Sequence, residues 1–191
     1  MLTLAEIGPA LYGAWRLAHL DPDGMRYFDR SVTGFWRSFR VAVLAAPLVI
    51  VILGADLSQM HIGGSWARVI IAETIAYVIS WVAYPLAAFY LVHLIDRQHD
   101  YFGFVTALNW GTLLQYAFLL PIHVVANSGL LSVGLADWLV FGGQFAVLAY
   151  EWFITRTALR TSGLTAASFV LVDFVIGYLV SFLGAMEAYA S

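Results

Sequence analysis

One apolar stretch, from Ala136 to Arg156, constrains the fold of this chain more than any other. It is long enough to cross a bilayer as a helix, which needs about 20 residues. Four polar residues interrupt it at spacings that place them on one side of a helix: Asp137, Gln144, Glu151 and Thr155. A membrane-spanning helix turns such a polar seam away from lipid. The stretch therefore predicts that other helices or water cover this seam.

The composition of the whole chain is also typical of a membrane protein. Of its 191 residues, 62% are hydrophobic and 11% are charged, whereas soluble domains are about half apolar and about a quarter charged. The chain has no cysteine, which excludes disulfides, thiolate metal sites and cysteine nucleophiles. All nine basic residues are arginine, a bias that we interpret as typical of a GC-rich bacterial genome.

The apolar segments predict five membrane spans, at about residues 35–55, 66–95, 102–122, 136–156 and 166–185. Residues 1–30 are expected to form a cytoplasmic or interfacial segment, because apolar side chains recur every three or four positions between Leu4 and Ala18. The predicted fold is all-α. It is a five-helix integral membrane bundle over residues 31–191, preceded by an N-terminal amphipathic interfacial helix.

The arginines indicate the orientation of this bundle. Five of them precede the first span, and the others on the same side are Arg97, Arg156 and Arg160. The opposite loops contain none, and Arg68 stands at the start of the second span. Because cytoplasmic loops carry the excess of positive charge, we expect a bacterial inner-membrane protein with a cytoplasmic N-terminus and a periplasmic C-terminus.

Four of these arginines would form one basic stripe on a continuous helix: Arg26, Arg30, Arg37 and Arg40. The stripe has two interpretations. It predicts a contact with anionic lipid or with a partner protein, or it is only the basic flank that cytoplasmic ends of spans usually carry.

Polar residues within the spans are the candidate functional residues. The predicted polar seam, or ion path, consists of Glu73, Asn109, Asp137, Gln144, Glu151 and Asp173. No basic residue lies in the middle of a span, so these groups either form a proton or cation path or join the helices by hydrogen bonds. Near the cytoplasmic side, Glu151 is expected to pair with Arg37 or Arg40. In the fifth span, small residues predict close helix packing: Gly177, Ser181 and Gly184.

Motifs for catalysis and for nucleotide binding are missing from the sequence. The chain is therefore expected to have no catalytic residues, no cofactor and no nucleic-acid partner. One group of residues has metal-ligand types: His93, Asp96, His99 and Asp100. Its spacing matches no known metal signature, and we interpret it as a solvated link between two spans, without a metal.

The layout of five close-packed spans, preceded by the segment Pro9–Trp15 (PALYGAW), resembles the Yip family of small membrane proteins. This resemblance implies a membrane adaptor without catalytic residues. The leading hypothesis is a non-enzymatic scaffold or accessory subunit, with membrane lipids and another membrane protein or a second copy as partners. The alternative is a small proton- or cation-coupled transporter or channel that uses the intramembrane acids. An enzyme acting on a lipid ranks third, because no nucleophile–base pair is evident.

The predicted orientation can be tested with reporter fusions. A reporter placed after Ser128 and another at the C-terminus should both be active only in the periplasm, because the arginines mark the opposite side. A cytoplasmic signal from either fusion would contradict the five-span arrangement.

Overall fold

The computed structural model describes the backbone of residues 4–58 and 65–189 and the side chains of residues 6–58 and 65–186. The start of the predicted segment 1–30 and the end of the predicted segment 31–191 lie outside these described residues. The described residues form helices and no strand, which confirms the all-α fold class. The elements are α1 (Leu4–Ala18), the 3-10 helix η1 (Pro22–Tyr27), α2 (Val32–Ser38), α3 (Val41–Leu57), α4 (Trp66–Leu94), the 3-10 helix η2 (Gln98–Asp100), α5 (Tyr101–Ala126), α6 (Val133–Ala158) and α7 (Gly163–Tyr189).

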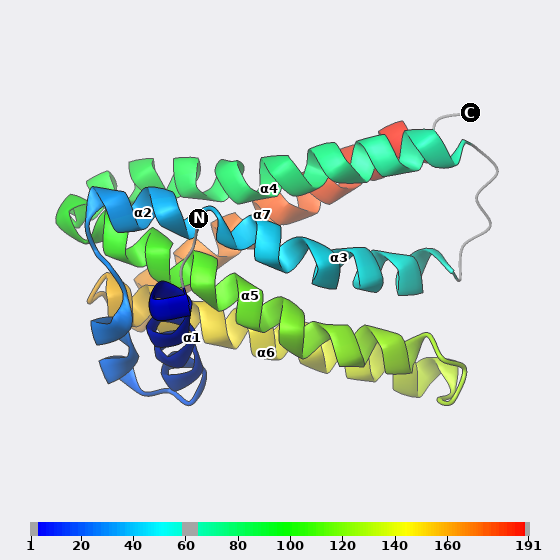
Figure 1. The fold of residues 1–191 in the computed structure, drawn as a ribbon, viewed down its shortest axis with the longest axis horizontal. Coiled ribbons are helices and arrows are strands. Elements are labelled where there is room, and N and C mark those ends of the chain that lie inside the picture. Colours follow the sequence, from blue (N-terminus) through cyan, green and yellow to red (C-terminus); the bar gives the residue numbers. More distant parts are fainter. Residues whose placement is uncertain (1–3, 59–64, 190–191) are drawn as a thin grey trace.

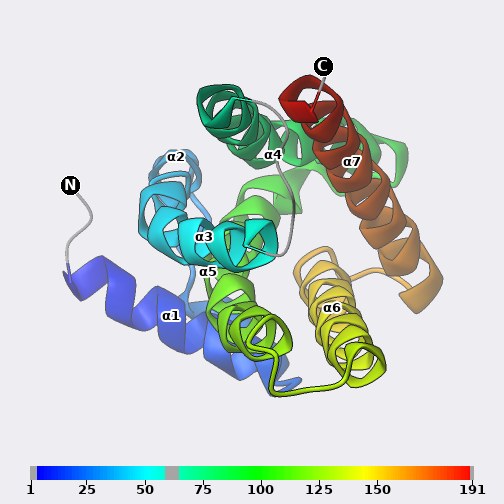
Figure 2. The same ribbon diagram turned by 90° about the vertical axis from the view of Figure 1, so that its right-hand side faces the viewer.

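The long helices α3 to α7 run back and forth along the longest axis of the molecule (Figure 1). They are arranged mainly as two pairs. Helix α4 packs chiefly against α7, and α5 packs chiefly against α6, while α3 lies against α5 (Figure 2). Helices α6 and α7 also contact each other, but α4 and α5 meet over only a small area.

Four segments are long and apolar enough to cross a membrane: Val32–Leu57, Trp66–Leu94, Val133–Ala158 and Gly163–Met186. This confirms, for the described residues, the prediction of a helical bundle with segments capable of spanning a membrane. Helix α5, which the sequence also predicts as a span, is not among the four. Its first turns are enclosed by protein, with Tyr101 and the run 103–111 buried, and a helix that faces protein needs less apolar surface than one that faces lipid. That all five helices cross the membrane stays a prediction.

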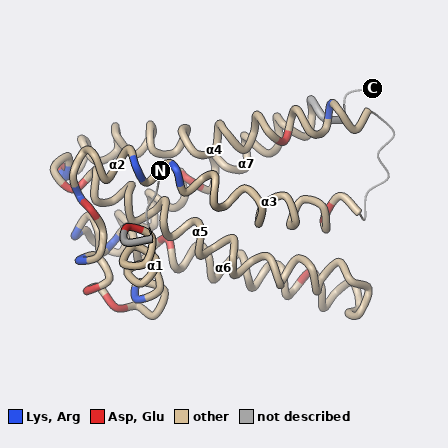
Figure 3. The backbone as a smooth tube through the Cα atoms, viewed as in Figure 1, with Lys and Arg blue, Asp and Glu red and all other residues tan. Residues whose placement is uncertain are grey.

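Apart from Arg68 in the first turn of α4, the arginines gather toward one end of the bundle (Figure 3). This arginine-rich end holds α1, η1, α2 and the two short links at residues 95–100 and 159–162. The last turns of α3 and α5 and the first turns of α4 and α6 form the opposite end, which we call the far end (Figure 1). The first helix and the end of α7 therefore lie at opposite ends. Which side of a membrane each end faces stays a prediction.

The basic stripe predicted on a continuous helix is not formed. The chain leaves the helical conformation after η1, and the hydroxyl of Ser31 accepts a hydrogen bond from the backbone N–H of Gly34 (3.1 Å), which starts α2 anew. The arginines consequently point to different partners. Arg26 pairs with Asp23 at 3.0 Å, Arg30 donates to the Met25 carbonyl at 3.1 Å and Arg37 pairs with Glu6 of α1. Among the described side chains, Arg40 has no ion-pair partner.

Helix α1 packs on the outside of α5 and α6 at the arginine-rich end. Its residues Ala14 and Leu17 are fully buried, whereas Tyr12 and Trp15 are about half exposed. The Tyr150 hydroxyl of α6 donates to the Ala14 carbonyl at 2.8 Å, which fixes the helix in place. The predicted amphipathic pattern is therefore present, and the position of α1 at a membrane interface stays a prediction.

The turn after α1 is held by an ion pair. Arg16 Nε donates to Asp21 Oδ2 at 2.6 Å, and this hydrogen bond lowers the pKa of the Asp21 carboxyl. Asp21 also accepts the backbone N–H of Asp23 at 3.0 Å, which caps η1. The two contacts join α1 to the segment that leads into α2.

Glycines allow close approach at two helix contacts. A Cβ atom at Gly111 of α5 would lie 2.7 Å from Ile154 Cδ1 of α6, so α5 and α6 pack tightly there. In α7, a Cβ atom at Gly184 would lie 3.3 Å from the Cβ of Ala76 in α4, but one at Gly177 would meet nothing within 4 Å. The close packing predicted at Gly177 is therefore not formed, because Gly177 and Ser181 line a cavity between the helices, whereas Gly184 does lie against α4.

This difference between two glycines of α7 can be measured. Gly184→Leu should lower the melting temperature in detergent, because the larger side chain forces α7 away from Ala76, at a cost of about 1–3 kcal/mol. Gly177→Leu should leave it unchanged or slightly raised, since leucine favours a helix by roughly 1 kcal/mol over glycine. Equal destabilisation by the two changes would contradict this packing.

Candidate functional site

The centre of the candidate site is a pair of acids on two neighbouring helices. Glu151 of α6 and Asp173 of α7 face each other within hydrogen-bonding range. A hydrogen bond between two carboxyl groups requires that one of them carries a proton. Glu151 lies about 10 Å before the end of α6, and Asp173 lies about 15 Å after the start of α7, counting 1.5 Å per residue. Both acids are therefore well inside segments that are long enough to span a membrane.

No arginine neutralises this pair. The ion pairs among the described residues involve neither Glu151 nor Asp173. The expected pairing of Glu151 with Arg37 or Arg40 is wrong. Arg37 is held by Glu6 of α1, and α3, which follows Arg40, packs on α5 and not on α6. The face of α6 that carries Glu151 is turned toward α7.

The acid pair opens into a cavity of about 420 Å³ between α4, α5, α6 and α7. Uncharged polar side chains from all four helices line it as well, among them Ser80, Asn109, Thr112, Gln115, Gln144 and Ser181. Several aromatic rings complete its wall. The pair α4–α7 thus forms one side of the cavity, and the pair α5–α6 forms the other side.

The cavity has a closed end and an open end. At the acid pair, Glu151 and Tyr84 are each only 5% exposed, whereas Gln144 and Ser181 are exposed. From Glu151 to Gln144, and from Asp173 to Ser181, the helices advance about 10–12 Å toward the far end. In the other direction, Phe104 and Phe169 are buried in contact with each other, with ring centroids 6.0 Å apart. The cavity therefore extends from the acid pair toward the far end and is closed on the arginine-rich side.

Three buried polar atoms in the described part of the chain have no hydrogen-bond partner: Tyr84 Oη, Glu151 Oε1 and Thr155 Oγ1. Tyr84 and Glu151 both line the cavity, and Thr155 lies one turn beyond Glu151 on α6. An unpaired buried polar group costs about 1–3 kcal/mol. Tyr84 and Glu151 thus each present a polar atom to the cavity that a ligand or an ion can bind.

The structure brings together four of the six residues predicted for the polar seam. Asn109, Gln144, Glu151 and Asp173 share the cavity. Glu73 instead lines a separate, mainly apolar cavity of about 470 Å³ between α3 and α4. Asp137 is exposed in the second turn of α6. A single path through all six residues is therefore not formed.

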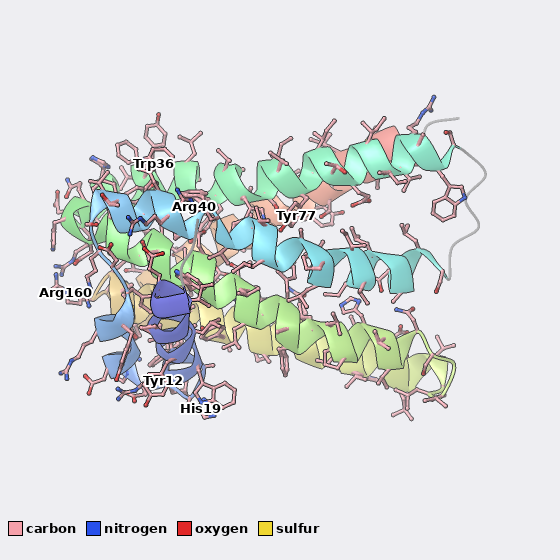
Figure 4. All side chains as sticks on the ribbon, viewed as in Figure 1. Tyr12, His19, Trp36, Arg40, Tyr77 and Arg160 are labelled. Carbon is pink, nitrogen blue, oxygen red and sulfur yellow. The ribbon has the colours of Figure 1, made fainter. Side chains whose placement is uncertain are left out.

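Polar side chains recur every three or four residues along α4, at Glu73, Tyr77, Ser80 and Tyr84, and they face two different partners. Tyr77 turns toward α3, and its hydroxyl donates to the Ala42 carbonyl at 2.6 Å (Figure 4). Ser80 and Tyr84, further along the helix, line the acidic cavity. The candidate site predicted from the sequence does not include Tyr84 or the aromatic wall. The four-residue spacing of polar groups along α4 was the only signal for Tyr84.

The acidic and histidine residues outside the cavity act as links between helices. Arg160 donates to both carboxylate oxygens of Asp100, at 2.8 and 3.0 Å, and His99 Nε2 lies 3.1 Å from the same carboxylate. At the far end, Asp56 of α3 lies 2.9 Å from His123 Nδ1 and accepts a hydrogen bond from Asn127 at 2.9 Å. Within the described ranges, no three side chains of His, Cys, Asp or Glu are placed to hold a metal ion.

No protein-family model, curated protein or solved structure matches this chain. The resemblance to the Yip family therefore stays a prediction.

The partner of Glu151 can be identified by double-mutant cycles. Glu151→Gln and Asp173→Asn should be coupled by about 0.5–3 kcal/mol, because contacting residues are not additive. Glu151→Gln and Arg40→Gln should be additive within about 0.5 kcal/mol. Unfolding in detergent measures both cycles. Coupling of Glu151 to Arg40, together with additivity between Glu151 and Asp173, would instead support the pairing of Glu151 with arginine that the sequence predicts.

Proposed function

We propose that this protein is a small membrane transporter or channel that moves a cation or a proton through the acidic cavity. The observation that carries this proposal is the Glu151–Asp173 pair, in which Glu151 is buried and Asp173 is half-buried between helices of membrane-spanning length, and which has no basic partner among the described residues. Intramembrane acids of this kind usually mark an ion path or a proton relay, because a buried charge without compensation is costly.

The pair has two ways to avoid an uncompensated charge. It takes up a proton, or it binds a cation, and each species displaces the other. An exchange of this kind at one site is sufficient to couple the movement of a proton to that of a cation. A purely structural hydrogen-bonded pair does not need the unpaired atoms Tyr84 Oη and Glu151 Oε1 beside it.

The form of the cavity favours a transporter over an open channel. Phe104 and Phe169 close the arginine-rich side, and the exposed lining residues Gln144 and Ser181 lie toward the far end. Transporters typically bind their substrates near the middle of the membrane, in a cavity that is open to one side at a time. The proposed location is the inner membrane of a bacterium, with the arginine-rich end toward the cytoplasm.

A scaffold or accessory-subunit role is the second candidate, and the surface of the arginine-rich end supports it. Arg40 is exposed and has no ion-pair partner among the described side chains, and Trp36, one turn earlier, is 66% exposed. The two residues are available for an anionic lipid or another membrane protein, as a Yip-type adaptor would require. Arg26, Arg30 and Arg37 are less available, because each has a partner within the chain.

Purified protein in proteoliposomes with an imposed pH gradient tests the transport proposal. Dissipation of the gradient should be faster than in empty liposomes, and Glu151→Gln or Asp173→Asn should slow it roughly tenfold or more, because each removes one of the two exchangeable groups.

The matched control is Asp137→Asn, which changes an exposed acid on the same helix as Glu151. It should transport at the wild-type rate. A wild-type rate equal to that of empty liposomes, together with a stoichiometric partner recovered from native membranes, would favour the scaffold.

A further inference from the structure

The size of the acidic cavity separates two classes of cation. Its volume of about 420 Å³ lies in the range of about 300–1,000 Å³ that is typical of pockets for small organic molecules. A single water molecule occupies roughly 30 Å³ in the liquid. The cavity is therefore far larger than a bare inorganic ion requires.

The wall of the cavity has few charged oxygen ligands for an inorganic ion, because most of its oxygen atoms belong to uncharged side chains. Hard divalent cations take about six or more oxygen ligands, and the described residues contain no group of three acidic or histidine side chains that converge. Among the described side chains, those of Glu151 and Asp173 are the only acids in the lining of this cavity. This chemistry does not favour calcium or magnesium.

Aromatic rings make up much of the wall instead. Trp81 and Tyr84 come from α4, Tyr116 from α5, and Phe174 and Tyr178 from α7. The faces of aromatic rings attract organic cations such as quaternary ammonium groups. Among the described side chains, arginines lie over the rings of Tyr12, Tyr27 and Trp152 only. The rings of the cavity are thus not occupied by a cation of the protein itself.

The acid pair carries one negative charge when it holds one proton, and this charge balances one positive charge on a ligand. The described titratable groups that line the cavity with Glu151 are Asp173 and Tyr178 on α7, Tyr84 on α4 and Tyr116 on α5, and none of them is basic. When both carboxyl groups are protonated the pair is neutral. When one proton leaves, the remaining shared proton holds the two groups together and the pair carries one negative charge.

We propose that the ligand of this cavity is a monovalent organic cation with apolar substituents, bound between the aromatic rings and the Glu151–Asp173 pair. This inference rests on the proposed function and gives it a substrate class. Binding is balanced by the release of one proton: the neutral, doubly protonated pair loses a proton to solvent as the cation enters. The proton and the organic cation therefore compete for the same site.

Tetraphenylphosphonium is a suitable probe, because its charge does not depend on pH. Its binding to the full chain in detergent is measured by calorimetry in buffers of different ionisation enthalpy, which also counts the protons released. Wild type should release about one proton per cation bound, and its affinity should weaken by up to about tenfold for each pH unit of acidification where the pair takes up its second proton.

Two variants locate the site, and two controls exclude binding to the micelle. Glu151→Gln should lose roughly tenfold or more in affinity and should release no proton. Phe174→Leu keeps both acids, and should lose about fivefold in affinity while it still releases the proton. Asp137→Asn and Glu73→Gln, whose acids lie outside this cavity, should bind the probe like wild type.

Binding that is equal in wild type and Glu151→Gln would overturn the inference. The inference would also be overturned if tetraphenylphosphonium released no proton from wild type while sodium or potassium did. In that outcome, the same ions would release no proton from Glu151→Gln. In that case the proposed cation-coupled function would stand with an inorganic substrate. If no cation released a proton and the proteoliposomes showed no flux, both the inference and the proposed function would be wrong.

Discussion

Burial of the first turns of α5 is the constraint on which the rest of this structure depends. Phe104, Val105 and Ala107 are fully buried, because α1, α2, α3 and α6 all pack on this helix. The arginine-rich end is thereby a closed core in which most side chains are apolar or hydrogen-bonded. Beyond this core the helices separate into two pairs, and the space between them forms the acidic cavity.

This arrangement also decides where polar groups are tolerated. In the core, Asn109 donates to the Ser38 hydroxyl at 2.8 Å, and that hydroxyl donates to the Phe35 carbonyl at 2.7 Å. These two side chains have partners, as the interior of a membrane protein demands. The unpaired atoms of Tyr84 and Glu151 lie in the wall of the cavity, and that of Thr155 lies one turn beyond Glu151 on α6.

The sequence predicted where helices lie along the chain more reliably than which helices pack against each other in space. The predicted spans 66–95 and 136–156 agree within a few residues with α4 and α6, since long apolar runs with polar ends define a helix by themselves. The basic stripe failed because the Ser31 cap restarts the helix. The pairing of Glu151 with arginine failed because it relied on shared depth in the membrane, whereas the direction around the helix axis decides which groups meet. That direction depends on helix order in space, and the sequence does not reveal that α4 packs on α7.

The two links that connect the helix pairs have a mechanical consequence. Both lie at the arginine-rich end, both contain a residue in the left-handed conformation (Asp96, φ 56°, and Arg160, φ 49°), and the Arg160–Asp100 ion pair joins them. The pairs α4–α7 and α5–α6 are thus held to each other at this end, near the acid pair. In a rotation of one pair against the other about these links, displacement grows with distance from the links. Such a rotation would change the width of the cavity toward the far end more than the spacing of Glu151 and Asp173.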